Sequence, residues 1–159
     1  MKRLLIGVLA AVIALTACSS SKKVYSANGA TVTTDSKDDS VTVRSSEGTM
    51  KMGKDVVDVA SLGVPIYTGA KEDEGALSVS GEKGTAQMTA FTTPDSFDKV
   101  YAFYHSKMPA GSEKMKVDSG DSSVAEFITG DEAAGAMQTM VMISKKGERT
   151  SIVITKGTK

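Results

Sequence analysis

The 159-residue sequence predicts an α+β fold: an antiparallel sheet with one main helix packed on one face, preceded by a small N-terminal β-meander. Three observations support this. Apolar residues recur at helical spacing over 97–108. Segments typical of strands lie on both sides, at 76–80 and 85–91 and then at 123–129, 136–144 and 150–155. Short polar turns join them, as in antiparallel sheets.

Residues 1–17 have the features of a signal peptide. Lys2 and Arg3 precede an apolar run over 4–15, which would be about 18 Å long as a helix. That is shorter than the roughly 30 Å hydrocarbon core of a bilayer, so a cleaved signal fits better than a membrane span. Residues 15–18 (LTAC) resemble the bacterial lipobox. A secretory signal followed by a chance cysteine is the alternative.

The lipobox resemblance implies that Cys18 becomes the first residue of the mature chain and carries covalent lipid, with a diacylglyceryl thioether on sulfur and usually an acylated amine such as a palmitoyl amide. Two or more acyl chains give lasting membrane attachment. Ser19 follows the cysteine, where an aspartate would favour retention at the inner membrane. The resemblance therefore implies an outer-membrane lipoprotein facing the periplasm in a diderm bacterium, or one on the outer face of a cell with one membrane.

Composition excludes several classes of protein. Loss of residues 1–17 removes two of the 19 basic residues and none of the 19 acidic ones, which leaves the mature chain slightly acidic. Such a balance is not that of a nucleic-acid-binding protein. Cys18 is the single cysteine, so a disulfide within the chain is excluded. The chain also lacks Trp, which carbohydrate and base-stacking surfaces commonly use.

The N-terminal part of the mature chain divides into two predicted segments. Residues 18–28 are polar at their start and read as a lipid-anchored, flexible tether. Residues 29–54 contain three short alternating segments, at 29–33, 39–43 and 48–52, which predict a β-ribbon. Its apolar residues are too few to hold a sheet alone. The ribbon therefore docks on the later domain, docks on a partner or is loosely ordered.

Residues 55–157 form the predicted α+β domain. We interpret 55–62 as a short helical turn, although a strand is the alternative, and 114–117 as a short segment before the last three strands. The main helix has Thr93 as its expected N-cap, Pro94 in its first turn and Asp95 near the positive end of its dipole. Pro109 and Gly111 end it.

Two segments of this domain resemble a family of uncharacterised bacterial lipoproteins and secreted proteins. These are 62–70 (LGVPIYTGA) and 95–104 (DSFDKVYAFY), which match the family's "VPIYPGA" segment and its helix ending in Phe-Tyr. Thr68 stands where the family prefers proline. The resemblance covers about residues 55–157 and implies a fold; it implies no activity and no catalytic residues.

Two sets of side chains are candidates for chemistry. His105 is the only histidine, and it could act as a general base in a small hydrolase, although a surface role near the helix end is favoured. Met137, Met140 and Met142, with Met50 and Met52, carry thioethers that select Cu(I). Packing in the core is the favoured role for them.

The sequence therefore predicts a non-enzymatic, lipid-anchored accessory or binding module of the cell envelope, which acts through a surface of its sheet or its ribbon. A Met-rich Cu(I)-binding periplasmic protein is the alternative, and a hydrolase using His105 is the third. We expect no cofactor apart from the covalent lipid on Cys18. The expected partners are the membrane, through that lipid, and an envelope protein; nucleic acid is not expected.

Overall fold

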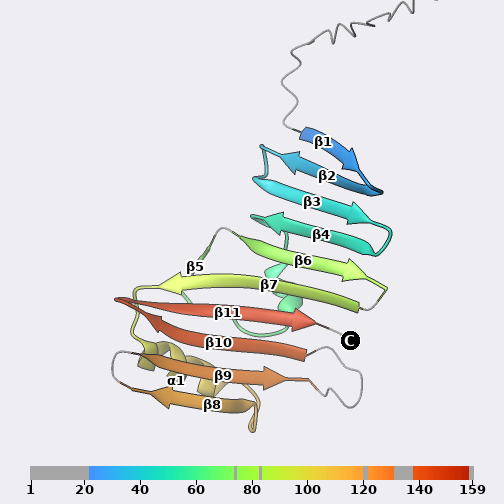
Figure 1. Cartoon of the computed structure of the whole chain (residues 1–159). Helices are drawn as coiled ribbons and strands as arrows, with labels where there is room; N and C mark the ends of the chain where they lie inside the picture. The colour runs from blue at the N-terminus through green and yellow to red at the C-terminus, as the bar shows by residue number, and fades with distance from the viewer. Residues whose placement is uncertain (1–21, 74, 83, 120–121, 131–137, 158–159) are drawn as a thin grey trace, which may run out of the picture.

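A computed structural model describes residues 22–157, apart from 74, 83, 120–121 and 131–137. These residues form one antiparallel sheet with a single α-helix on one side (Figure 1). No helix in the described part of the chain is long and apolar enough to cross a membrane. The signal-peptide and lipidation predictions, including Cys18, concern residues outside the described ones.

The sheet runs in the order β1-β2-β3-β4-β6-β7-β11-β10-β9-β8, and β5 pairs with β7. All its pairings are antiparallel. The strands are β1 Lys22–Ala27, β2 Ala30–Asp35, β3 Ser40–Ser45, β4 Gly48–Gly53, β5 Lys71–Glu72, β6 Ala76–Gly81, β7 Gly84–Thr93, β8 Glu113–Asp118, β9 Ser123–Thr129, β10 Gln138–Lys146 and β11 Arg149–Gly157. The two helices are η1, a 3-10 turn at Val59–Leu62, and α1 Phe97–Lys107.

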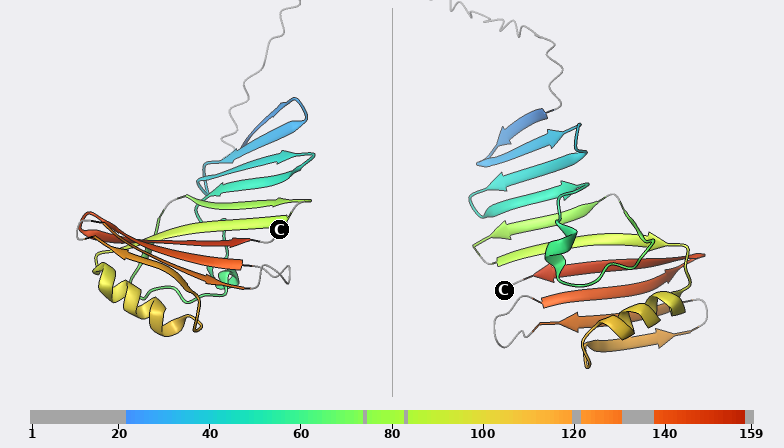
Figure 2. Two further views of the ribbon diagram at one scale, coloured as in Figure 1. Left: turned by 60° about the horizontal axis from the view of Figure 1, so that its bottom comes forward. Right: turned by 180° about the vertical axis from the view of Figure 1, so that it is seen from behind.

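The α+β prediction is wrong, because this fold is mainly β: an 11-stranded sheet with one short α-helix. The physical reason lies at β4 and β6. Met50 of β4 pairs with Val79 of β6, and this ladder extends the sheet of 76–157 into the ribbon. The predicted boundary at 54/55 thus falls between strands of one sheet, and the backbone of the ribbon is satisfied by pairing with it (Figure 2).

The sheet begins earlier than the sequence predicted. Residues 22–27, expected to belong to a flexible tether, form β1 and pair with β2. The turn between them is Asn28-Gly29, and both residues have positive φ, 50° and 77°. This is the backbone that the commonest two-residue hairpin turn requires, and Asn-Gly is its strongest sequence signal.

The hydrophobic core lies between the sheet and a layer formed by α1 and η1. Val100 and Tyr104 of α1 are fully buried, as are Val141 and Ile152 of the sheet. Leu62 of η1 joins the same cluster, and its carbonyl accepts a 3.0 Å hydrogen bond from the buried Thr139 hydroxyl. Core and helices therefore occupy one side of the sheet (Figure 2).

The helix predicted from the apolar periodicity is confirmed at 97–107, but it begins later than expected. Ser96 is the N-cap residue, with extended backbone, in place of the predicted Thr93. The Thr93 hydroxyl instead accepts a hydrogen bond from the Asp95 amide at 3.2 Å. This bond turns the chain out of β7 before the helix starts. Residues 59–62 likewise confirm a helical turn in the segment 55–62.

The Tyr104 hydroxyl is an unfavourable polar group within this core. The side chain is fully buried, and its hydroxyl has no hydrogen-bond partner among the described residues. Burial raises the pKa of Tyr104 to about 12; the nearby Tyr67 backbone opposes this shift, but it forms no hydrogen bond with the hydroxyl. A buried hydroxyl without a partner costs roughly 1–3 kcal/mol in desolvation.

We therefore expect Tyr104→Phe to raise the free energy of unfolding by about 1 kcal/mol, as measured by urea denaturation. The matched control is Tyr67→Phe. The Tyr67 hydroxyl donates a 2.8 Å hydrogen bond to Asp95, so its loss should destabilise the protein. A loss of stability in Tyr104→Phe would contradict the expectation.

Candidate functional site: the uncovered face of the sheet

The two faces of the sheet differ in what covers them. On β10, Val141 and Ile143 point into the core and are fully buried, so Met140 and Met142 between them point to the opposite face. Both helices lie on the core side, and Figure 1 views the sheet from the other side, where no helix lies over the strands. In the described part of the chain, this second face is uncovered.

Apolar side chains form continuous rows across this uncovered face. Strand register places Val41, Met52, Leu77 and Met88 side by side on β3, β4, β6 and β7. Directly paired residues of neighbouring strands share a face, so each is in reach of the next. The row continues over β11, β10 and β9 through Thr155, Met140 and Ile128.

Parallel rows extend the same surface in both directions along the strands. One runs through residues of β1, β2, β3, β4 and β6, and another through residues of β7, β11 and β10. We call the whole surface the apolar face. It consists of Tyr25, Val32, Val41, Val43, Met50, Met52, Leu77, Val79, Ala86, Met88, Ala90, Met115, Val117, Val124, Ile128, Met140, Met142 and Val153.

Several large side chains of this face are open to solvent. Met50 and Met88 are each 39% exposed, Met52 is 47% exposed and Tyr25 is 59% exposed. Scattered apolar residues are ordinary on protein surfaces, but a contiguous patch of this extent usually marks an interaction site. The apolar face is therefore the candidate functional site.

The opposite face of the same N-terminal strands is polar apart from Val24 of β1, which pairs with Thr33. Its paired positions on β2, β3, β4, β6 and β7 are Thr33, Thr42, Lys51, Ser78 and Gln87. The N-terminal strands are therefore amphipathic, although neither face of β1 to β4 is covered by a helix (Figure 2). Solubility alone would be served by polar residues on both sides, so the asymmetry indicates a use for the apolar side.

A groove of about 660 Å³ hollows one end of the apolar face, at the hairpin loops after β3 and β6. Val43, Met50 and Val79 line its floor, and Glu47 and Glu82 lie at its edge. Gly48 permits this arrangement, because a Cβ there would lie 2.2 Å from the Ser80 carbonyl oxygen. The close approach of the two hairpins shapes the groove.

The predicted methionine cluster is placed in part. Met140 and Met142 lie on the apolar face together with Met50 and Met52, and Met88 also lies there. Met137 lies outside the described residues. The prediction that these side chains pack in the core is wrong for Met50 and Met52, which are exposed, whereas Met140 and Met142 are half-buried on the face opposite the core.

His105 lies away from this face, on the exposed side of α1. Its Nε2 is 3.6 Å from Oε2 of Glu113, which also accepts a 3.0 Å hydrogen bond from the Tyr101 hydroxyl. The Lys116 ammonium lies 3.8 Å from the centre of the Tyr101 ring. Within the described residues, no three His, Cys, Asp or Glu side chains gather to hold a metal ion.

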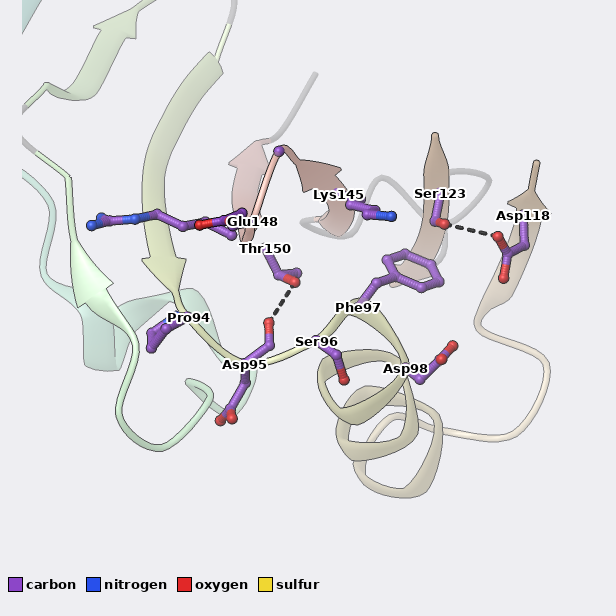
Figure 3. A pocket seen from close by; sticks show the side chains of 12 residues that line it. Pro94, Asp95, Ser96, Phe97, Asp98, Asp118, Ser123, Lys145, Glu148 and Thr150 are labelled. Atoms are coloured by element: carbon purple, nitrogen blue, oxygen red, sulfur yellow. Dashed lines mark hydrogen bonds between the residues drawn. The ribbon is translucent and has the colours of Figure 1, made fainter. Parts of the chain in front are cut away.

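A second pocket, of about 340 Å³, lies where α1 begins (Figure 3). Its lining mixes acidic and basic side chains. Two of its hydroxyls already bond within the protein: Thr150 donates to the Asp95 carbonyl at 2.7 Å and Ser123 to Asp118 at 2.9 Å. These bonds join the start of the helix to the sheet, and we assign this pocket a structural role.

Asp95 is the best-connected carboxylate near this pocket. It accepts hydrogen bonds from the Tyr67 hydroxyl at 2.8 Å and from the Lys99 ammonium at 3.2 Å. These two bonds, led by that from Tyr67, lower the pKa of Asp95 below its ordinary value of 3.8. They hold the 62–70 segment against the start of α1.

A lowered folded-state pKa means that this carboxylate stabilises the protein fully above pH 3.8 and loses the effect as pH falls through the folded value. We expect Asp95→Asn to destabilise the protein modestly at pH 7, because the site is partly exposed and solvent screens the interaction. The difference from wild type should shrink below about pH 4. Urea denaturation at pH 7, 5 and 3 measures this, with the exposed Asp98→Asn as control. A constant difference across that range would contradict it.

Sequence reasoning found the apolar residues of the ribbon but not the surface that they form. The signal was present: Val32, Val41 and Val43, with Met50 and Met52, alternate with polar residues, and Asn28-Gly29 fixes the first hairpin.

Comparison of the chain with protein-family models, curated proteins and solved structures finds no match.

Proposed function

We propose that this chain is a lipid-anchored, non-enzymatic binding or accessory module of the cell envelope, which engages its partner through the apolar face. The observation that carries the proposal is the continuous apolar surface on one face of the N-terminal strands, which form a single layer with polar residues on the other face. Burial of such a surface contributes roughly 25 cal/mol per Å². A partner is the natural source of that burial.

The anchor part of the proposal rests on residues 1–18 of the sequence. A lipid on Cys18 would attach the chain four residues before β1 begins at Lys22. The sheet would then stand close to the membrane, in the periplasm at the outer membrane of a diderm bacterium. The intact mass of the protein purified from its membranes, beside Cys18→Ala, tests this. A mature chain that starts at another residue, or that carries no lipid, would contradict the proposed lipid anchor.

A crosslinking pull-down from native membranes tests the binding part. The decisive variants are Met52→Glu on the apolar face and Lys51→Glu, its neighbour on the opposite face of β4. Both side chains are exposed, so neither change should prevent folding. We expect capture by wild type and Lys51→Glu and loss in Met52→Glu. Equal capture by both variants would contradict a role for the apolar face.

A second candidate function is Cu(I) binding, and the shared face of the methionines favours it. Met50 and Met52 are two residues apart on β4, as are Met140 and Met142 on β10, so each pair lies about 7 Å apart along its strand. Flexible thioethers at that spacing can converge on one soft cation. The two pairs lie on different strands, which would make two separate sites.

Anaerobic titration of the full chain with Cu(I) against a competing chelator tests this candidate. Replacing Met137, Met140 and Met142 together with Met50 and Met52 by Leu should weaken binding at least tenfold while the fold is kept, because Leu and Met are similar in size. Met108→Leu, in the core beside α1, is the control. Unchanged affinity in the variant that lacks both methionine pairs would exclude Cu(I) binding at this face.

A further inference from the structure

We infer that the occupant of the apolar face is a second copy of this chain, and that two copies pack face to face as a two-layered sandwich. The inference rests on the proposed function in that it uses the same face, and it names the partner. It requires no lipid on Cys18. Its test can therefore fail separately from the proposed anchor.

The size of the face meets what a stable dimer needs. Ten strands lie along one path, most of them six residues long. At about 4.8 Å per strand and 3.3 Å per residue, the face measures about 48 by 20 Å, or about 950 Å². Sheet twist prevents full contact. Contact over two-thirds of the face still reaches the roughly 600 Å² per partner of the smaller stable interfaces.

The chemistry of the face suits a copy of itself. A two-fold interface uses the same patch on both subunits, and an apolar patch needs no separate complementary surface. Two sheets packed about 10 Å apart interdigitate their side chains, which flexible Met side chains accomplish without exact shape matching. The central positions Leu77, Val79 and Met88 would form the most buried part.

The charged positions define how the two copies lie. Lys23 of β1 and Glu126 of β9 lie at opposite ends of the face, paired with Thr34 and Met142. A two-fold axis parallel to the strands places the β1 end of one copy over the β9 end of the other, so opposite charges approach. An axis across the strands would place like charges together. The parallel axis is therefore the favoured one.

The test is thiol crosslinking of the full chain in its native membranes with a short bis-maleimide. Single cysteines are introduced on the apolar face at Val43, Leu77 and Met142, and on the opposite face at Thr42 and Ser78. Wild type gives the baseline. A lipidated Cys18 does not react, and a reactive one reveals failure of the anchor without changing the comparison between faces.

We expect a product of twice the monomer mass from at least one position on the apolar face and only baseline from the opposite face. Adding Met88→Glu to Leu77→Cys should reduce that product at least tenfold, because a charge at the centre would be buried without a partner. Gln87→Glu, its neighbour on the other face of β7, should leave it unchanged.

Three results would overturn the inference. The first is baseline crosslinking at every position of the apolar face. The second is a product whose mass is not twice that of the monomer, which would identify a different partner on this face. The third is a dimer that Met88→Glu leaves intact, because its copies would then meet through another surface. Met88 is 39% exposed in the single chain, so glutamate there is compatible with folding.

Discussion

Replacing Phe127 by alanine is expected to lower the free energy of unfolding by about 4 kcal/mol, the largest effect of any single substitution considered for this chain. Phe127 is 1% exposed on β9, and its ring lies 6.0 Å from that of Tyr101 and 6.4 Å from that of Tyr104, centre to centre. Its loss would remove both aromatic contacts and leave a cavity between α1 and the sheet. The surrounding strands are held by their ladders and cannot collapse into it.

Chemical denaturation followed by far-UV circular dichroism measures this loss. Phe127→Leu, which keeps most of the volume, should cost about 1 kcal/mol. Val117→Ala on β8, where the side chain is 50% exposed, should change stability by less than about 0.5 kcal/mol. If Phe127→Ala lost no more than Phe127→Leu, the core between α1 and β9 would be looser than described.

Gly48→Ala is expected to separate the N-terminal strands from the rest of the sheet. Gly48 has a φ of 151°, and an added Cβ would lie 2.2 Å from the Ser80 carbonyl oxygen. Backbone cannot yield as a flexible side chain can, so the β4–β6 ladder would open at this end. We expect a cost of about 3 kcal/mol, larger than conformational strain alone.

Hydrogen exchange distinguishes a local opening from general unfolding. In Gly48→Ala, amides of β1 to β4 should exchange faster, while those of β7, β9, β10 and β11 keep their protection. Gly29→Ala is the matched control, because Gly29 also has positive φ, 77°, but nothing lies within 4 Å of its Cβ position. It should cost only about 1–2 kcal/mol. Equal effects of the two changes would contradict a steric role for Gly48.

Local patterning was sufficient to predict most of the elements. Alternation and turn residues located β6, β7, β9, β10 and β11 close to their observed bounds, and the apolar periodicity located α1. Such signals are local, because each depends on residues a few positions apart. The identification of Ser96 as the N-cap in place of Thr93 shows the usual limit at element ends.

What the sequence could not supply was the long-range pairing of β4 with β6. Residues 54–75 separate these strands, and no pattern in either one specifies the other as its neighbour. Without that ladder, residues 29–54 were predicted to be a ribbon that is not stable alone, and the fold class was predicted as α+β and not as mainly β. Missing the ladder also concealed the apolar face, because Met52, Leu77 and Met88 become one row only through that pairing.

The order of the strands also determines how this sheet would respond to a mechanical load. β1, β2 and β3 bond only with their sequence neighbours, β4 bonds with β3 and β6, and β1 is the outermost strand. A pull on Lys22 directed away from the sheet therefore breaks one ladder at a time, from the edge inward, as in repeat proteins whose units contact only their neighbours. The helix-covered strands come last. Under tension the N-terminal strands would detach one after another and the chain would extend stepwise. After release the strands would pair again, while the buried core stayed folded.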